Sequence, residues 1–182
     1  MDARTVNFFS EGTKMEGDLF LPSDYKARER RPTIVLCHGF TGVRSLILGD
    51  YAEVFCLAGF VVLTFDYRGY GGSEGTRRRL IPLEQVDDIR KAISFVETLP
   101  EVDPNRIGFW GTSFGGRMRP TLLESIAASR RWSVRSASGT ASVFCLIPGV
   151  SVNARSCYRR LPRTGVDVRL RALASGSTLS MR

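Results

Sequence analysis

Histidine is almost absent from this 182-residue chain, which contains only His38. No lysine follows Lys91, and the only acidic residues after Gly116 are Glu124 and Asp167. No segment reaches the roughly 18 apolar residues that a membrane span needs, and no apolar run follows a basic start at the N-terminus. We therefore expect a cytoplasmic protein with no membrane partner.

Cysteine is also scarce, because the chain has four cysteines and no CxxC pair. Cys37 and Cys56 lie inside apolar segments, where a free cysteine acts as a small hydrophobic residue. Neither a disulfide nor a metal site is expected from this pattern.

Positive charge is concentrated in the last third of the chain. The formal net charge is +8, which alone would suggest an anionic partner. Residues 1–116 carry 3 Lys and 11 Arg against 16 acidic residues, a net of −2, whereas residues 117–182 carry 12 Arg against 2 acidic residues, a net of +10. The basic character therefore belongs to the C-terminal segment alone.

Five apolar segments predict strands. Residues 5–9 and 17–21 flank a turn-like SEGTK and predict an antiparallel pair. Residues 32–37, 61–66 and 106–110 are short apolar runs, each followed by a glycine-rich loop, as is typical of parallel strands buried on both faces.

Two helices are predicted between these strands, over residues 50–59, ending at Gly59, and from Pro82 to Pro100. Alternating strands and helices favour right-handed βαβ crossovers in a single α/β domain. The second helix should bury one face (Leu83, Val86, Ile89, Ile93, Val96 and Leu99) and expose another (Asp87, Asp88, Arg90 and Lys91).

The segment Gly111-Thr112-Ser113-Phe114-Gly115 lies between a predicted strand and a possible helix. In that context G-x-S-x-G describes a sharp turn in which glycines let the backbones pass and the serine hydroxyl projects from the sheet edge. A helix N-terminus behind the serine supplies amide donors where an oxyanion would form. Ser113 is therefore a candidate nucleophile, and the alternative is a loop serine between turn glycines.

A second loop, His38-Gly39-Phe40-Thr41-Gly42, follows the strand at 32–37. A loop at that sheet edge can direct the Phe40 amide toward the same oxyanion as the Phe114 amide. His38 could be a general base, but we favour a role in fixing the loop through hydrogen bonds.

These segments resemble the α/β-hydrolase family, and more closely its dienelactone-hydrolase-like and X-prolyl-peptidase-like serine hydrolases. The matching motifs cover about two thirds of the chain, within residues 5–116. They are HGFTG (38–42), DYRGYGGSEG (66–75), EQVDDIRKAI (84–93), LPEVDPNRIG (99–108) and GTSFGG (111–116).

The resemblance implies an α/β-hydrolase fold with a mostly parallel sheet and Ser113 as nucleophile. It also implies that the oxyanion-hole amides come from Phe40 and Phe114. Such enzymes act on small-molecule acyl substrates, namely esters, thioesters, lactones or peptides, without a metal or organic cofactor. Arg68 lies in a loop that looks structural in the family, and a substrate role for it is the alternative.

The chain departs from the family after Ser113. Such hydrolases place the acid and then the histidine after the nucleophile, but no histidine follows here. Glu124 would lie roughly 16 Å along the next helix, and Asp167 has no histidine to orient. Loss of a triad member costs on the order of 10⁴ or more in rate in model proteases. We therefore expect a hydrolase fold that is incomplete after the nucleophile elbow.

Residues 117–182 form an Arg/Ser-rich segment, with 12 Arg and 11 Ser, and only residues 141–150 suggest a buried strand. Three interpretations are open: a reading frame that shifts just after Gly116, a divergent completion of the sheet, or an authentic basic tail for polyanions. We favour the frame change, because out-of-frame GC-rich sequence yields Arg, Ser, Ala, Gly and Pro with few lysines or acids. Specific nucleic-acid recognition is not expected.

Two functions therefore remain. The chain is predicted to be a serine hydrolase of small acyl substrates that acts through an acyl-enzyme at Ser113. The alternative is a catalytically inactive α/β-hydrolase fragment, or a binding module with a basic tail. The chain is predicted to consist of the N-terminal part of an α/β-hydrolase domain, residues 1–116, followed by the divergent or frame-shifted Arg/Ser-rich segment, residues 117–182.

Overall fold

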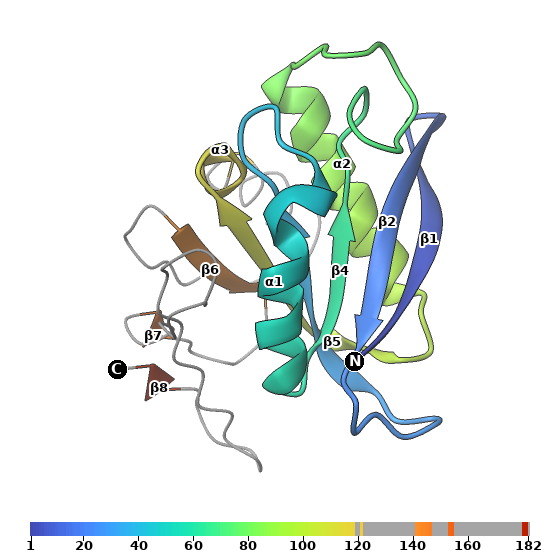
Figure 1. The fold of residues 1–182 in the computed structure, drawn as a ribbon, viewed down its shortest axis with the longest axis vertical. Helices are drawn as coiled ribbons and strands as arrows, with labels where there is room; N and C mark the ends of the chain where they lie inside the picture. Colours follow the sequence, from blue (N-terminus) through green and yellow to red (C-terminus); the bar gives the residue numbers. More distant parts are fainter. Residues whose placement is uncertain (119–120, 122–140, 147–152, 155–179, 182) are drawn as a thin grey trace.

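The structure is a computed structural model that describes residues 1–118, 121, 141–146, 153–154 and 180–181 (Figure 1). Its strands and helices follow one another as β1 (Asp2–Ser10), β2 (Thr13–Leu21), β3 (Arg31–Cys37), α1 (Arg44–Leu57), β4 (Val61–Phe65), α2 (Pro82–Glu97), β5 (Val102–Thr112), α3 (Phe114–Arg117), β6 (Ala141–Leu146), β7 (Asn153–Ala154) and β8 (Ser180–Met181).

A mixed sheet of six strands, in the order β1-β2-β4-β3-β5-β6, forms the centre of the described fold. The predicted antiparallel hairpin is confirmed as β1 and β2, and β2 pairs antiparallel with β4. The three predicted buried strands are also confirmed, since β3 pairs parallel with both β4 and β5. The predicted α/β class is therefore correct, but the sheet is mixed and not mostly parallel, because only β4, β3 and β5 pair in parallel.

The strand order places α1 and α2 on opposite faces of the sheet. The chain moves from β3 to its neighbour β4, and then back across β3 to β5. Two right-handed crossovers that run in opposite directions must cover opposite faces. Figure 1 shows α1 crossing in front of the strands and α2 behind them.

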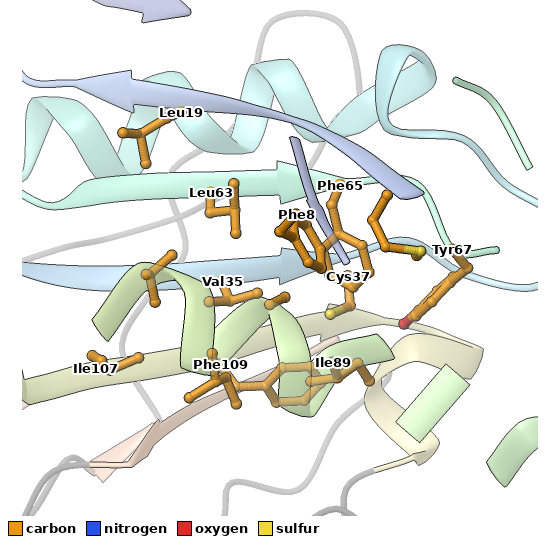
Figure 2. Packing of buried hydrophobic residues seen from close by; sticks show 14 of the residues in the cluster. Phe8, Leu19, Val35, Cys37, Leu63, Phe65, Tyr67, Ile89, Ile107 and Phe109 are labelled. Carbon is orange, nitrogen blue, oxygen red and sulfur yellow. The ribbon is translucent and has the colours of Figure 1, made fainter. Parts of the chain in front are cut away.

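Alternate residues of the central strands fill two separate cores, as buried parallel strands require. Val35 and Cys37 of β3 belong to the core with Ile89 of α2, together with Phe65 and Phe109 (Figure 2). On the other face, residues of β3, β4 and β5 pack against α1. These residues are Ile34, Leu36, Val62 and Trp110, in contact with Leu48, Tyr51, Ala52 and Phe55.

Helix α1 begins at Arg44, earlier than the start at residue 50 that the sequence predicted. The first turns contain Leu48, which is fully buried, and Gly49, which obscures the helical pattern because glycine is a poor helix former. The predicted end is close to correct, because Gly59 follows the helix in the left-handed region, with φ of 87°.

Helix α2 confirms the predicted start at Pro82 but corrects two of its residues. Leu83 is 64% exposed, because the first turn of α2 extends beyond the ends of the strands (Figure 1). Asp88, predicted to be outside, is fully buried, because it pairs with Arg68 in the loop that follows β4.

Strand β6 lies at the sheet edge and pairs antiparallel with β5. It covers the first part of the strand predicted over residues 141–150, and residues 147–150 lie outside the described residues. Within the described ranges, none of the helices has the length and apolar character needed to cross a membrane.

Candidate active site

Ser113 occupies a sharp turn between β5 and α3. Its backbone has φ of 50° and ψ of −115°, which is unusual for a residue other than glycine. Such strained positions persist only where the surrounding structure fixes them, and they cluster at functional sites. The side chain is exposed, so the hydroxyl is open to a ligand.

The glycines around Ser113 are required by close backbone contacts. A Cβ added at Gly111 would lie 2.5 Å from the carbonyl carbon of Gly115. One added at Gly115 would lie 2.6 Å from the backbone oxygen of His38 and 2.9 Å from that of Cys37. The turn after β5 and the loop after β3 therefore pack backbone against backbone.

The structure brings together the three residues that the sequence singled out: Phe40, Ser113 and Phe114. A Cβ added at Gly39 would lie 3.3 Å from Cβ and 3.9 Å from Oγ of Ser113, so the Phe40 loop runs beside the serine. The rings of Phe40 and Phe114 meet edge to face, with centroids 5.8 Å apart. Phe40 remains 65% exposed, so the loop beside Ser113 carries an exposed apolar side chain.

His38 is buried and engaged within its own loop. Its Nδ1 lies 2.9 Å from the backbone oxygen of Gly39, and its Nε2 accepts the Tyr67 amide at 3.5 Å. This pair of contacts assigns the proton to Nδ1. Burial lowers the pKa of the imidazole below its usual value, which favours the neutral ring. Both ring nitrogens thus serve the loop, as expected for a residue that fixes it.

Arg68 has partners within the fold. Its NH2 group donates to Asp88 Oδ1 at 2.6 Å and to Ser10 Oγ at 3.0 Å, and its backbone amide donates to Asp88 Oδ2 at 3.1 Å. These contacts join the loop after β4 to α2 and β1. They give Arg68 a structural function and do not require a substrate.

Arg44, which directly follows the loop that contains Phe40, was missed by the sequence analysis. Its guanidinium binds Glu16 Oε1 at 2.6 Å, Asp18 Oδ2 at 2.8 Å and the carboxylate of buried Asp66. Glu16 and Asp18 are two residues apart on β2, and so share one face of the sheet. The pair of acidic residues on one face of β2 was the available signal, because it indicates that a basic side chain packs against that face.

The two acidic residues after the elbow, Glu124 and Asp167, lie outside the described residues. Within the part of the chain that is described, no cluster of histidine, cysteine and acidic side chains is suited to hold a metal ion.

Comparison with known proteins gives a family match over most of the chain. The family model described as serine aminopeptidase, S33, matches residues 28–155. The chain is 41% identical over 112 residues to the quorum-quenching protein AidA of Acinetobacter baumannii, a match that covers 61% of this chain and 36% of AidA. It is 38% identical over 107 residues to the thiohydrolase aneE of Aspergillus aculeatus, covering 58% of this chain and 32% of the relative.

Among solved structures, the α/β-hydrolase GrgF of a Penicillium species has a TM-score of 0.62 and 28% identity, over 68% of this chain and 42% of GrgF. The match to this chain spans only about a third of the length of AidA and of the thiohydrolase aneE.

Proposed function

Because the chain belongs to the serine aminopeptidase S33 family of α/β-hydrolases, we propose that it attacks small acyl substrates through Ser113. The observation that carries this proposal is the position of Ser113. It stands exposed at a left-handed φ between β5 and α3, with Gly39 of the neighbouring loop against it. A serine on such a turn is held in place for attack and does not have to be ordered by the substrate.

The oxyanion formed in the attack would be bound by the backbone amides of Phe40 and Phe114. One amide belongs to the residue after Ser113, and the other to the residue after Gly39, which lies against the serine. Each such donor is worth on the order of 10²–10³ in rate in model enzymes.

The chemical step joins Ser113 Oγ to the acyl carbon and breaks the bond from that carbon to the leaving oxygen, sulfur or nitrogen. The hydroxyl proton passes to water or to the leaving group, because His38 has both nitrogens engaged elsewhere. A water molecule then attacks the acyl carbon and breaks its bond to Oγ, which releases the acid and restores the serine hydroxyl with a proton from that water. A serine that is not activated by a histidine base is a weak nucleophile, and the single histidine of this chain is engaged in its own loop, so activated acyl compounds are the substrates of choice.

Thioesters are the class we favour among esters, thioesters, lactones and peptides. A thiol is a better leaving group than an alcohol or amine and needs less protonation as it departs. A thiohydrolase is also among the relatives of this chain. Apolar acyl groups fit best, because Phe40 is 65% exposed on the loop beside Ser113 and its ring meets that of Phe114.

A second candidate function is acyl binding without turnover. It is favoured by one observation, the engagement of the single histidine of the chain inside a loop. In this case the site would bind an acyl compound beside Ser113 and form no covalent intermediate.

Labelling with a fluorophosphonate probe distinguishes these functions. The wild-type protein and Ser113→Ala would be compared, with Ser94→Ala as control, because Ser94 is an exposed serine of α2. We expect covalent labelling of the wild type and of Ser94→Ala, and none of Ser113→Ala. Labelling that persists in Ser113→Ala would refute the assignment of the nucleophile. A complete absence of labelling would favour acyl binding without turnover.

A further inference from the structure

We propose that Asp66 is a positioning residue that holds the Phe40 loop against Ser113. Its carboxylate anchors the end of the loop, and the neighbouring Tyr67 anchors the start. The proposal rests on the function proposed for Ser113, but the anchoring itself can be measured without any reaction at the serine.

The anchor at the end of the loop is the buried carboxylate of Asp66. Its Oδ1 accepts the backbone amide of Arg44 at 2.7 Å, and its Oδ2 binds the Arg44 guanidinium and the amide of Gly72, the latter at 3.1 Å. The Asp66 side chain is 2% exposed, so these contacts are shielded from water. A charge-assisted bond to a backbone amide in such a site is stronger than a neutral one.

The anchor at the start is His38. Its ring accepts the amide of Tyr67 and packs edge to face against the Tyr67 ring, with centroids 4.5 Å apart. Two consecutive residues of the loop after β4 therefore hold both ends of residues 38–44. Phe40 lies between the two anchors, within a turn closed by the bond from the Gly42 amide to the Gly39 oxygen at 3.2 Å.

Asp66 is itself fixed by further contacts, so the anchor is rigid. Ser73 donates its hydroxyl to the Asp66 backbone oxygen at 2.6 Å and accepts the Glu16 amide at 2.9 Å. Arg44 also binds Glu16 and Asp18 on β2. The Phe40 loop is thereby connected to β2 and to the loop after β4, and not only to its own strand.

Loss of this anchor should release the loop and leave the fold intact. Without the carboxylate, the Arg44 amide loses its bond to Asp66 Oδ1, and the end of the loop is held less firmly against Ser113. A displacement of about 1 Å at a catalytic donor can cost about a hundredfold in rate. We expect Asp66→Ala to slow acylation of Ser113 by about tenfold to a hundredfold.

The first experiment is amide hydrogen exchange on the whole protein, which does not require an active serine. In Asp66→Ala, exchange in residues 38–46 should become at least tenfold faster than in the wild type. Asp66→Asn retains an oxygen acceptor for the Arg44 amide and should show a smaller change. Asp88→Ala is the matched control, because it removes another buried carboxylate paired with an arginine, and the partner of Asp88 is Arg68, which lies outside residues 38–46.

The second experiment is the rate of fluorophosphonate labelling of Ser113, measured where all variants are folded. We expect the order wild type, Asp66→Asn, then Asp66→Ala, with Asp88→Ala close to the wild type. A purely structural role for Asp66 predicts instead that both alanine variants lose labelling in proportion to their stability.

The outcomes separate the two proposals. If the wild type is not labelled but exchange at residues 38–46 rises only in Asp66→Ala, the anchoring is correct and the proposed reaction is not. If exchange at residues 38–46 in Asp66→Ala matches the wild type or Asp88→Ala, the anchoring proposal is overturned. It is also overturned if the wild type is labelled and Asp66→Ala is labelled equally fast.

Discussion

Phe40 and Phe114 contact each other edge to face, with ring centroids 5.8 Å apart, and the loop that carries Phe40 runs beside Ser113. The same two residues are proposed to supply the oxyanion amides. Their backbones would thus bind the polar atom of an acyl group while their rings contact its hydrocarbon. Because Phe40 is 65% exposed, this apolar surface is open to a ligand.

Phe40→Ala should therefore weaken the reaction with longer acyl groups more than with acetyl. A partly buried contact between the Phe40 ring and a hexanoyl chain contributes about 1 kcal/mol, which corresponds to roughly fivefold in kcat/KM. The release of p-nitrophenol from acetyl and hexanoyl esters measures the difference. Leu57→Ala is the control, because Leu57 is also exposed and apolar but lies at the C-terminal end of α1, away from the Phe40 loop that precedes the helix. An equal loss for both esters would contradict acyl binding by Phe40.

The elbow glycines yield a second prediction, on stability. Gly115→Ala should lower the free energy of unfolding by about 1–3 kcal/mol, because its Cβ would meet the backbone oxygens of His38 and Cys37, which cannot rotate away. Gly49→Ala is the matched control. Its Cβ would meet nothing within 4 Å, and alanine is the better helix former, so a gain of about 0.5–1 kcal/mol is expected. Urea unfolding measures both, and a neutral Gly115→Ala would argue against the tight elbow.

Local patterns predicted most of the described fold correctly. The short apolar runs of β3 and β4 identified buried strands because both faces of a parallel strand must be apolar. The sharp turn at Ser113 was also predictable, because the flanking Gly111 and Gly115 are local signals of close backbone contact. Partners that lie far apart in sequence were not predictable. Asp88 follows a helical pattern that places it outside, yet Arg68, 20 residues earlier, retains it in the interior.

The Asp66 anchor was missed for the same reason. Asp66 was recognised only as part of a loop motif, because its partner Arg44 is 22 residues away and no local periodicity connects them. The role of the residues after Gly116 could not be predicted for a different reason. The family match continues to residue 155, but no histidine follows Ser113 to complete a triad.

His38 supplies a third prediction, a pH dependence of stability. Its pKa is lowered in the folded protein, mainly by burial, whereas an unfolded histidine titrates near 6.5. The unfolded chain therefore binds more protons between these two pKa values, and stability must fall as the pH decreases below about 6.5. The slope for one proton is at most about 1.4 kcal/mol per pH unit.

Urea unfolding of the wild type and His38→Gln between pH 7.5 and 5.5 tests this expectation. Because His38 is the only histidine, its substitution should flatten the dependence in this interval. Should both proteins lose stability equally, the titrating group is not His38.

The charge of residues 117–182 supplies the last prediction. With 12 arginines and 2 acidic residues, this segment should bind polyanions of any sequence at low salt, whatever its origin. An evolved recognition element would add contacts to bases, and only these give preference among sequences. A charge that results from a shifted reading frame would give counterion release alone, so affinity should fall steeply and equally for all sequences as salt rises.

Competition between RNA and DNA sequences at about 0.15 M salt, where screening acts beyond about 8 Å, distinguishes the two cases. We expect all sequences to lose binding together. A tenfold advantage of one sequence, which corresponds to about 1.4 kcal/mol, would instead establish the segment as a recognition element and exclude the frame change.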